Sequence, residues 1–102
     1  MNVTKIKEEQ VSGITDIMKA MAHPIRLKIL CLLKNGSLNV TQLEHSLEIN
    51  QALVSQQLKI LRLNKLVMVE RKGGYANYSL YPDRKQTILK IINNLCTLFT
   101  ES

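Results

Sequence analysis

The feature that most constrains the fold is a pair of short helical segments separated by a turn of three residues. Asn39 is expected to cap the first segment, and Gln42 can reach back to it in a variant of the capping box, so a helix is predicted to about Leu47. Residues 48–50 form the turn, and Asn50 caps a longer second helix. Two short helices joined by so tight a turn predict a helix-turn-helix.

A β-hairpin is predicted directly after the second helix. Beyond Asn64 the apolar pattern changes from helical spacing to alternation, over residues 67–71 and again over residues 75–81. Lys-Gly-Gly at residues 72–74 lies between them and suits a tight turn, because such turns need positive φ angles.

Further helices are predicted before this unit. Apolar residues at steps of three and four indicate an amphipathic helix over residues 4–22, which the pair His23-Pro24 interrupts. Residues 24–34 continue as a helix with an apolar middle on every side, as expected for a central helix, and Gly36 closes it.

A last helix is predicted from Arg84, after Pro82 ends the hairpin. Its apolar stripe comprises Ile88, Leu89, Ile91, Ile92, Leu95, Cys96 and Phe99. The fold class is therefore mainly α with a β-hairpin wing, a winged helix-turn-helix of about five helices and two strands. The 102 residues are expected to form a single domain, since a second core would need roughly 50 more.

The charge of the chain is positive and concentrated in one region. Seven basic and two acidic residues lie between Lys59 and Lys85, which accounts for five of the six net positive charges. This favours a polyanion such as nucleic acid, although an acidic membrane surface fits the charge equally well. No 18-residue apolar run and no signal-peptide core is present, so a cytoplasmic protein that does not enter a membrane is expected.

The outward side of the second helix and the hairpin tip are the candidate DNA-binding surface. Residues expected to face inward on the helix are Leu53, Val54, Leu58 and Leu61. Those expected to read base edges or lie against them are Gln51, Ala52, Ser55 and Gln56, and those expected to bind phosphates are Lys59, Arg62, Arg71 and Lys72. An exposed polar helix side is often merely solvated, but its position before a basic hairpin favours double-stranded DNA. Tyr75 and Tyr78 are interpreted as strand packing.

One such domain presents a single recognition helix, which is a small contact for a specific operator. A twofold homodimer that reads two half-sites is therefore expected. The first and last helices would form the interface, because both have apolar stripes broader than a monomer of this size needs.

Five segments resemble the ArsR/SmtB family in order and spacing, over about residues 10–99. They are MKAMAHPIRLKIL at residues 18–30, VTQL at 40–43, QALVSQQLKIL at 51–61, RKGG at 71–74 and YSL at 78–80. The resemblance implies homodimeric winged-helix repressors that leave DNA when an inducer binds. Two positions depart from the family pattern, since Ala52 stands where proline is frequent and Lys65 where a glycine usually closes the recognition helix.

Metal sensing, common in that family, is disfavoured here. The family's metal ligands are cysteines at the start of the helix that begins near Val40, or Asp, His and Glu on the last helix. Residues 37–40 read Ser-Leu-Asn-Val, and the last helix offers only Asp83 and Cys96, so no metal and no cofactor is expected. The two histidines, at residues 23 and 45, are interpreted as structural or solvated.

The two cysteines, Cys31 and Cys96, are similar in arrangement to the persulfide- and redox-sensing branch of the family. That resemblance implies that they face each other within one subunit and become joined by a disulfide or polysulfide bridge, which tilts the recognition helices away from their half-sites. The inducer would be a persulfide, a polysulfide or an oxidant. Lys28, one turn before Cys31, is placed where it could lower the pKa of that thiol, although a lysine on a helix is more often simply solvated.

Other functions remain open at this point. Both cysteines lie on apolar stripes and can be inert packing, which leaves a constitutive or metal-responsive regulator, or an antirepressor that displaces another repressor. An enzyme with a cysteine nucleophile is not expected, because the chain has no Cys-x-x-Cys pair, no glycine-rich phosphate loop and no well-placed histidine base.

Overall fold

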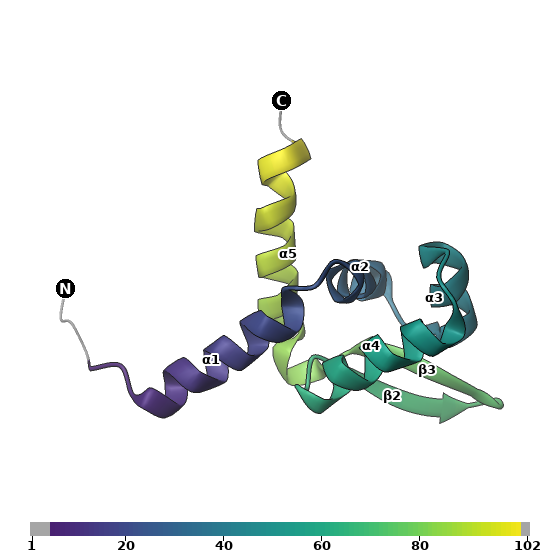
Figure 1. Cartoon of the computed structure of the whole chain (residues 1–102), viewed down its shortest axis with the longest axis horizontal. Helices are drawn as coiled ribbons and strands as arrows, with labels where there is room; N and C mark the ends of the chain where they lie inside the picture. Colours follow the sequence, from purple (N-terminus) through teal and green to yellow (C-terminus); the bar gives the residue numbers. More distant parts are fainter. Residues whose placement is uncertain (1–4, 101–102) are drawn as a thin grey trace.

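The structure is a computed structural model that describes residues 5–100, with the side chains of residues 99 and 100 left out (Figure 1). The predicted helix start at Thr4 and the predicted side-chain contribution of Phe99 lie outside the described residues. The elements in chain order are α1 (Glu8–Met21), α2 (Pro24–Leu32), η1 (Leu33–Asn35), β1 (Leu38–Asn39), α3 (Val40–Leu47), α4 (Gln51–Leu63), β2 (Val67–Lys72), β3 (Tyr75–Leu80), η2 (Pro82–Arg84) and α5 (Lys85–Thr100).

The break between α1 and α2 follows from the sequence His23-Pro24. Pro24 occupies the first turn of α2, where its missing N–H costs nothing, and the His23 Nδ1 atom accepts a hydrogen bond from the Ile25 amide at 3.2 Å. The structural interpretation of His23 is thus confirmed. The helix ends at Leu32, before the predicted Lys34, and passes into the 3₁₀ turn η1, after which Gly36 has a φ of 140°.

The helix-turn-helix forms as predicted. The Asn39 Oδ1 atom accepts from the Gln42 amide at 2.8 Å, and Gln42 Oε1 accepts from the Asn39 amide at 2.9 Å, which confirms the capping box. Asn50 Oδ1 accepts from the Leu53 amide at 2.8 Å and caps α4. These local bonds satisfy amides that the first turn of each helix leaves without a partner.

The wing is one strand larger than predicted. Residues 5–100 contain a three-stranded antiparallel sheet in the order β1-β3-β2, in which Leu38 pairs with Tyr78. The prediction of two strands missed β1 because a two-residue strand has no periodic pattern of its own. The tight turn between β2 and β3 is confirmed, with φ angles of 60° at Gly73 and 83° at Gly74.

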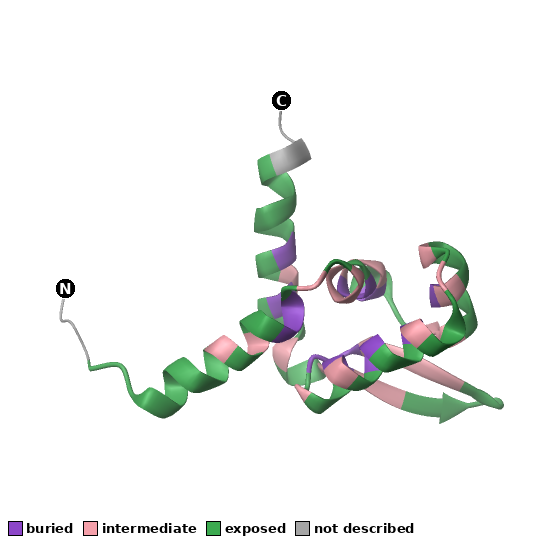
Figure 2. Ribbon diagram, in the orientation of Figure 1, coloured by how far each residue is buried: buried purple, intermediate pink, exposed green. Residues whose placement is uncertain are grey.

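The core lies between α2, α3, α4 and the base of the wing, and α1 and α5 contribute to it only in part. Figure 2 shows α1 and the far end of α5 as mostly exposed, whereas the buried positions cluster where the helices meet. The radius of gyration is 15.1 Å, against about 13 Å for a compact domain of 100 residues. The two outer helices therefore project from the body of the molecule (Figure 1). No helix within residues 5–100 is long and apolar enough to cross a membrane.

Candidate nucleic-acid interface

The outward side of α4 is polar and accessible, as predicted. The exposed residues of this side are Gln51, Ala52, Ser55, Gln56, Lys59 and Arg62. On the opposite side, Val54, Leu58 and Leu61 are fully buried, whereas Leu53, predicted to face inward, is only half-buried. The helix thus presents hydrogen-bonding side chains and two cations outward on a rigid, capped support.

The wing carries its cations near the tip. Arg71 and Lys72 end β2 and are exposed, next to the Gly-Gly turn. Tyr78 is half-buried and packs against the core, which confirms its interpretation as strand packing. The same interpretation is wrong for Tyr75, which is 60% exposed. The reason is its register, since it pairs with Lys72 at the tip, beyond the reach of the core.

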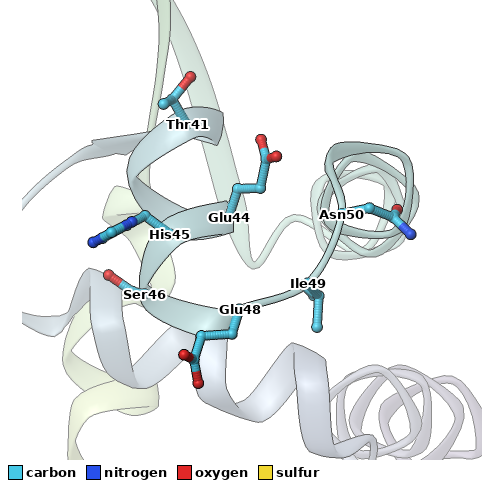
Figure 3. A pocket seen from close by; sticks show the side chains of 7 residues that line it. All are labelled: Thr41, Glu44, His45, Ser46, Glu48, Ile49 and Asn50. Carbon is cyan, nitrogen blue, oxygen red and sulfur yellow. The ribbon is translucent and has the colours of Figure 1, made fainter.

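A polar hollow lies beside the helix-turn-helix, on the side of α3 (Figure 3). It is lined by Thr41, Glu44, His45, Ser46, Glu48, Ile49 and Asn50. His45 is exposed, as expected of a solvated histidine. Glu48 ends α3 with a φ of 56°, which turns the chain sharply toward α4.

The end of α4 is marked by a long-range hydrogen bond and by a residue with a strained backbone. Arg84 Nη1 donates to the Asn64 carbonyl oxygen at 2.8 Å, which ties the start of the last helical region to the recognition helix. Lys65 has a φ of 56°, the left-handed conformation that a glycine adopts without strain. Lys65 therefore departs from the family pattern in residue type but not in backbone conformation, which is the one that glycine favours.

Two residues that the sequence prediction missed connect α4 to the rest of the fold. Gln57 lies on the buried side of α4 and is 6% exposed. Its Oε1 atom accepts a hydrogen bond from Arg26 Nη1 at 2.9 Å. A polar residue in phase with the apolar stripe of a helix was the available signal, because a buried amide requires a partner.

A continuous apolar surface lies on α1 and α5. A groove almost without polar lining is formed by Ile14, Ile17, Met18, Met21, Ala22, Leu27, Thr87, Ile91 and Leu95. Met18 is 64% exposed and Leu95 is 47% exposed. Large side chains of this kind, gathered on one surface, are typical of an interaction site.

The two cysteines lie on α2 and α5, and Cys96 is close enough to act electrostatically on Cys31. Cys31 is half-buried and Cys96 is exposed. Burial raises the pKa of the Cys31 thiol, the nearby Cys96 raises it further, and Lys34 opposes the rise. Of the two alternatives for Lys28, the effect on this pKa is wrong, because the cation that opposes the rise is Lys34, whereas Lys28 is exposed to solvent.

A second contact joins the same two helical regions. Lys34 Nζ donates to Asn93 Oδ1 at 3.4 Å. Lys34 follows Cys31 by three residues and Asn93 precedes Cys96 by three, so this contact lies about one turn from each thiol. Within the described part of the chain, no group of three or more His, Cys, Asp or Glu side chains is arranged to hold a metal ion.

This architecture, a capped helix-turn-helix followed by a basic hairpin, defines a winged helix-turn-helix protein. Residues 23–67 match the sequence model of the family described as "Bacterial regulatory protein, arsR family". The biofilm growth-associated repressor of Xylella fastidiosa is 30% identical over 92 residues, which is 90% of this chain and 78% of that protein. The transcriptional repressor PagR of Bacillus anthracis is 37% identical over 90 residues, which is 87% of this chain and 90% of that protein.

A solved structure shows the same likeness in three dimensions. Reduced HlyU from Vibrio cholerae superimposes with a TM-score of 0.81 at 31% identity, covering 92% of this chain and 96% of that one. The chain belongs to the ArsR family of bacterial regulatory proteins, and it is a DNA-binding transcriptional regulator. The resemblance to the ArsR/SmtB family noted in the sequence is confirmed, and a biofilm growth-associated repressor and HlyU are among the proteins that the chain resembles.

Proposed function

We propose that the chain is a homodimeric, non-enzymatic repressor whose affinity for a double-stranded DNA operator falls when Cys31 and Cys96 become joined. The observation that carries this proposal is that Cys96 lies close enough to Cys31 to raise the pKa of the Cys31 thiol. One lies on α2, which packs against the recognition helix, and the other on α5, which carries the exposed apolar surface.

DNA recognition follows from the two exposed polar elements. The α4 helix enters the major groove, where Gln51, Ser55 and Gln56 hydrogen-bond to base edges and the Ala52 methyl group meets a thymine methyl. Phosphates on either side are bound by Lys59, Arg62, Arg71 and Lys72. These contacts position one recognition helix on one half-site.

The apolar surface of α1 and α5 takes a second copy of this chain. A helix with an apolar stripe needs a partner for it, and within one subunit the side chains of Ile14, Met18 and Leu98 remain exposed. A twofold pair buries this surface against itself and presents two recognition helices to two half-sites. The specificity that a single helix lacks then comes from the spacing of the half-sites.

The switch is a thiol exchange with a persulfide, RSSH, as inducer. The exposed Cys96 thiolate attacks the sulfane sulfur, which gives a Cys96 persulfide and releases RSH. The Cys31 thiolate then attacks the inner sulfur of that persulfide, which forms the Cys31–Cys96 disulfide and releases hydrogen sulfide. The inducer is reduced, the two thiols are oxidised, and the thiol hydrogens leave on RSH and hydrogen sulfide.

The test is a mobility-shift titration on DNA selected for binding, with protein that is reduced, treated with organic persulfide, or treated with zinc. Release by persulfide alone is expected, with Cys31→Ser and Cys96→Ser still binding DNA but ignoring the persulfide. Mass spectrometry of the treated protein should show the loss of two hydrogens from one subunit. Equal affinity in every state would contradict the switch and leave a constitutive regulator with both cysteines as packing. Release by zinc alone would indicate a metal-responsive regulator.

A further inference from the structure

One guanidinium at the start of α2 connects three helices. Arg26 Nε donates to the Ala20 carbonyl oxygen at 2.6 Å, and Nη2 donates to the Lys19 carbonyl oxygen at 3.2 Å. The remaining terminal nitrogen, Nη1, donates to Gln57 Oε1 at 2.9 Å. A single side chain of α2 therefore bridges the last turn of α1 and the middle of the recognition helix α4.

The α1 end of this bridge follows from the proline that breaks the helix. In a continuous helix the Ala20 carbonyl would accept from the amide of residue 24, but Pro24 has no N–H. The adjacent His23 amide donates instead to the Met21 carbonyl oxygen, at 2.8 Å. Arg26 supplies the missing donor, and its positive charge lies at the negative end of the α1 dipole.

The α4 end of the bridge depends on orientation. Gln57 is buried on the same side of α4 as Val54, Leu58 and Leu61. Water therefore has little access to its amide oxygen as a replacement hydrogen-bond donor. If α4 rotated or slid relative to α1, the bond from Arg26 would break and leave this oxygen buried without a donor. Because a guanidinium is planar and its donors point in fixed directions, the bonds to α1 and to α4 can form at the same time only in one orientation of these two helices.

We propose that Arg26 is a positioning residue that sets the orientation of α1 relative to the recognition helix. The consequence for DNA rests on the proposed function, since it requires α1 to lie in the dimer interface. In that dimer, the α1 to α4 orientation of each subunit fixes the separation of the two recognition helices and hence the half-site spacing that the protein accepts.

The orientation is measured within one subunit by double electron–electron resonance between nitroxide labels on α1 and α4. The labels are attached through Ser12→Cys and Ser55→Cys, both exposed positions, in a chain that carries Cys31→Ser and Cys96→Ser. Dilution with an excess of unlabelled protein removes distances between subunits. The chain with Arg26 intact is expected to give one narrow distance distribution.

Three variants then separate positioning from simple support of the fold. Arg26→Lys keeps the charge but loses the planar set of N–H donors. Gln57→Leu keeps the two bonds to α1 but loses the acceptor on α4. Both variants are expected to shift or broaden the distance distribution. Lys28→Met removes a cation from an exposed position of the same helix and is expected to leave it unchanged. Unchanged distributions in Arg26→Lys and Gln57→Leu, even with a lowered melting temperature, would overturn the proposal.

The DNA readout uses a selected duplex and the same duplex with one base pair added between the half-sites. The protein with Arg26 intact is expected to bind the selected duplex more tightly than the lengthened one. Arg26→Lys is expected to reduce the ratio of these two affinities by about tenfold, a typical coupling between two sites. A uniform loss of affinity on both duplexes and on a single half-site would contradict positioning. If the unmodified protein is monomeric or ignores DNA, the proposed function fails, whereas the distances within one subunit still decide the role of Arg26.

Discussion

The recognition helix α4 and the outer helix α1 are both amphipathic and of similar length, 13 and 14 residues, yet their apolar sides have different surroundings. In α4 the apolar side is buried by the chain itself, and Leu58 has no exposed surface. In α1 the apolar side remains open, and Ile14 is 57% exposed. The helix-turn-helix thus completes its core within one subunit, whereas the surface of α1 is the part that the proposed dimer completes.

The buried side of α4 should be the most sensitive part of the molecule. Leu58→Ala is expected to lower the free energy of unfolding by about 2–5 kcal/mol, because it removes buried methyl groups and leaves a cavity. Leu63 lies on the same helix and is 67% exposed, so Leu63→Ala should change it by less than about 0.5 kcal/mol. Denaturant unfolding monitored by circular dichroism measures both, and equal losses would contradict the contrast in burial.

Substitutions on the exposed apolar side of α1 should weaken dimerisation rather than folding of the subunit. Met18→Glu places a carboxylate in the proposed interface and is expected to weaken the dimer by about a hundredfold or more. Ser12→Glu introduces the same charge at an exposed position outside the apolar groove and serves as the control. Sedimentation equilibrium measures both variants, and a Met18→Glu protein that stays as dimeric as its control would remove the case for this interface.

A lysine at the wing tip allows a test of whether the wing contacts DNA phosphates. Lys72→Gln is expected to lower the slope of log affinity against log salt by about 0.9 for each phosphate that the lysine no longer neutralises, or about 1.8 for a dimer. Lys90 is an exposed lysine on α5, and Lys90→Gln should leave the slope unchanged. Binding isotherms at several salt concentrations supply the slopes, and the same slope for both variants would place the wing away from the phosphates.

The strained end of α4 should yield a smaller gain in stability. Lys65 has a φ of 56°, a conformation that costs a residue with a Cβ atom about 1 kcal/mol. Lys65→Gly removes this strain and is therefore expected to raise the free energy of unfolding. The gain is at most about 1 kcal/mol, because glycine loses more backbone freedom on folding than lysine does. Thermal and denaturant unfolding measure the change, and a clear loss of stability would mean that the lysine side chain has a favourable contact.

The smallest effect concerns Cys31, which lies on α2. Burial, and to a lesser extent Cys96, raise the pKa of its thiol, so less of the reactive thiolate is present near neutral pH. Alkylation of Cys31, followed by mass spectrometry, should be slower than in unfolded protein and should keep accelerating at a pH where the unfolded rate has levelled off. Because the folded state keeps the neutral thiol, this group also lowers stability as pH rises above the unfolded pKa. In Cys96→Ser the pKa should fall only partly, and a rate equal to that of unfolded protein would show that burial has no effect.

Local chemistry explains why much of the fold was predictable. The caps at Asn39 and Asn50, the break at Pro24 and the Gly-Gly turn depend on bonds between residues at most four apart, and all of them appear in the structure. The outward side of α4 was predictable for the same reason, since helical period alone decides which residues share a side.

The errors have a common physical cause in partners that are distant along the chain. Strand β1 forms only because β3 passes beside it. The pKa of Cys31 follows from burial and from Cys96, which is 65 residues away. None of these partners can be read from neighbouring residues.

The order of the elements, their caps and turns, and the polar side that α4 presents could be read from the chain alone, because each depends on residues within one or two helical turns. The bond from Arg26 to Gln57, 31 residues away, and the simultaneous bond to the end of α1 became evident only in the folded molecule. A buried hydrogen bond requires both groups to arrive at the same place in the fold, and this depends on the packing of whole helices rather than on the preference of any one segment.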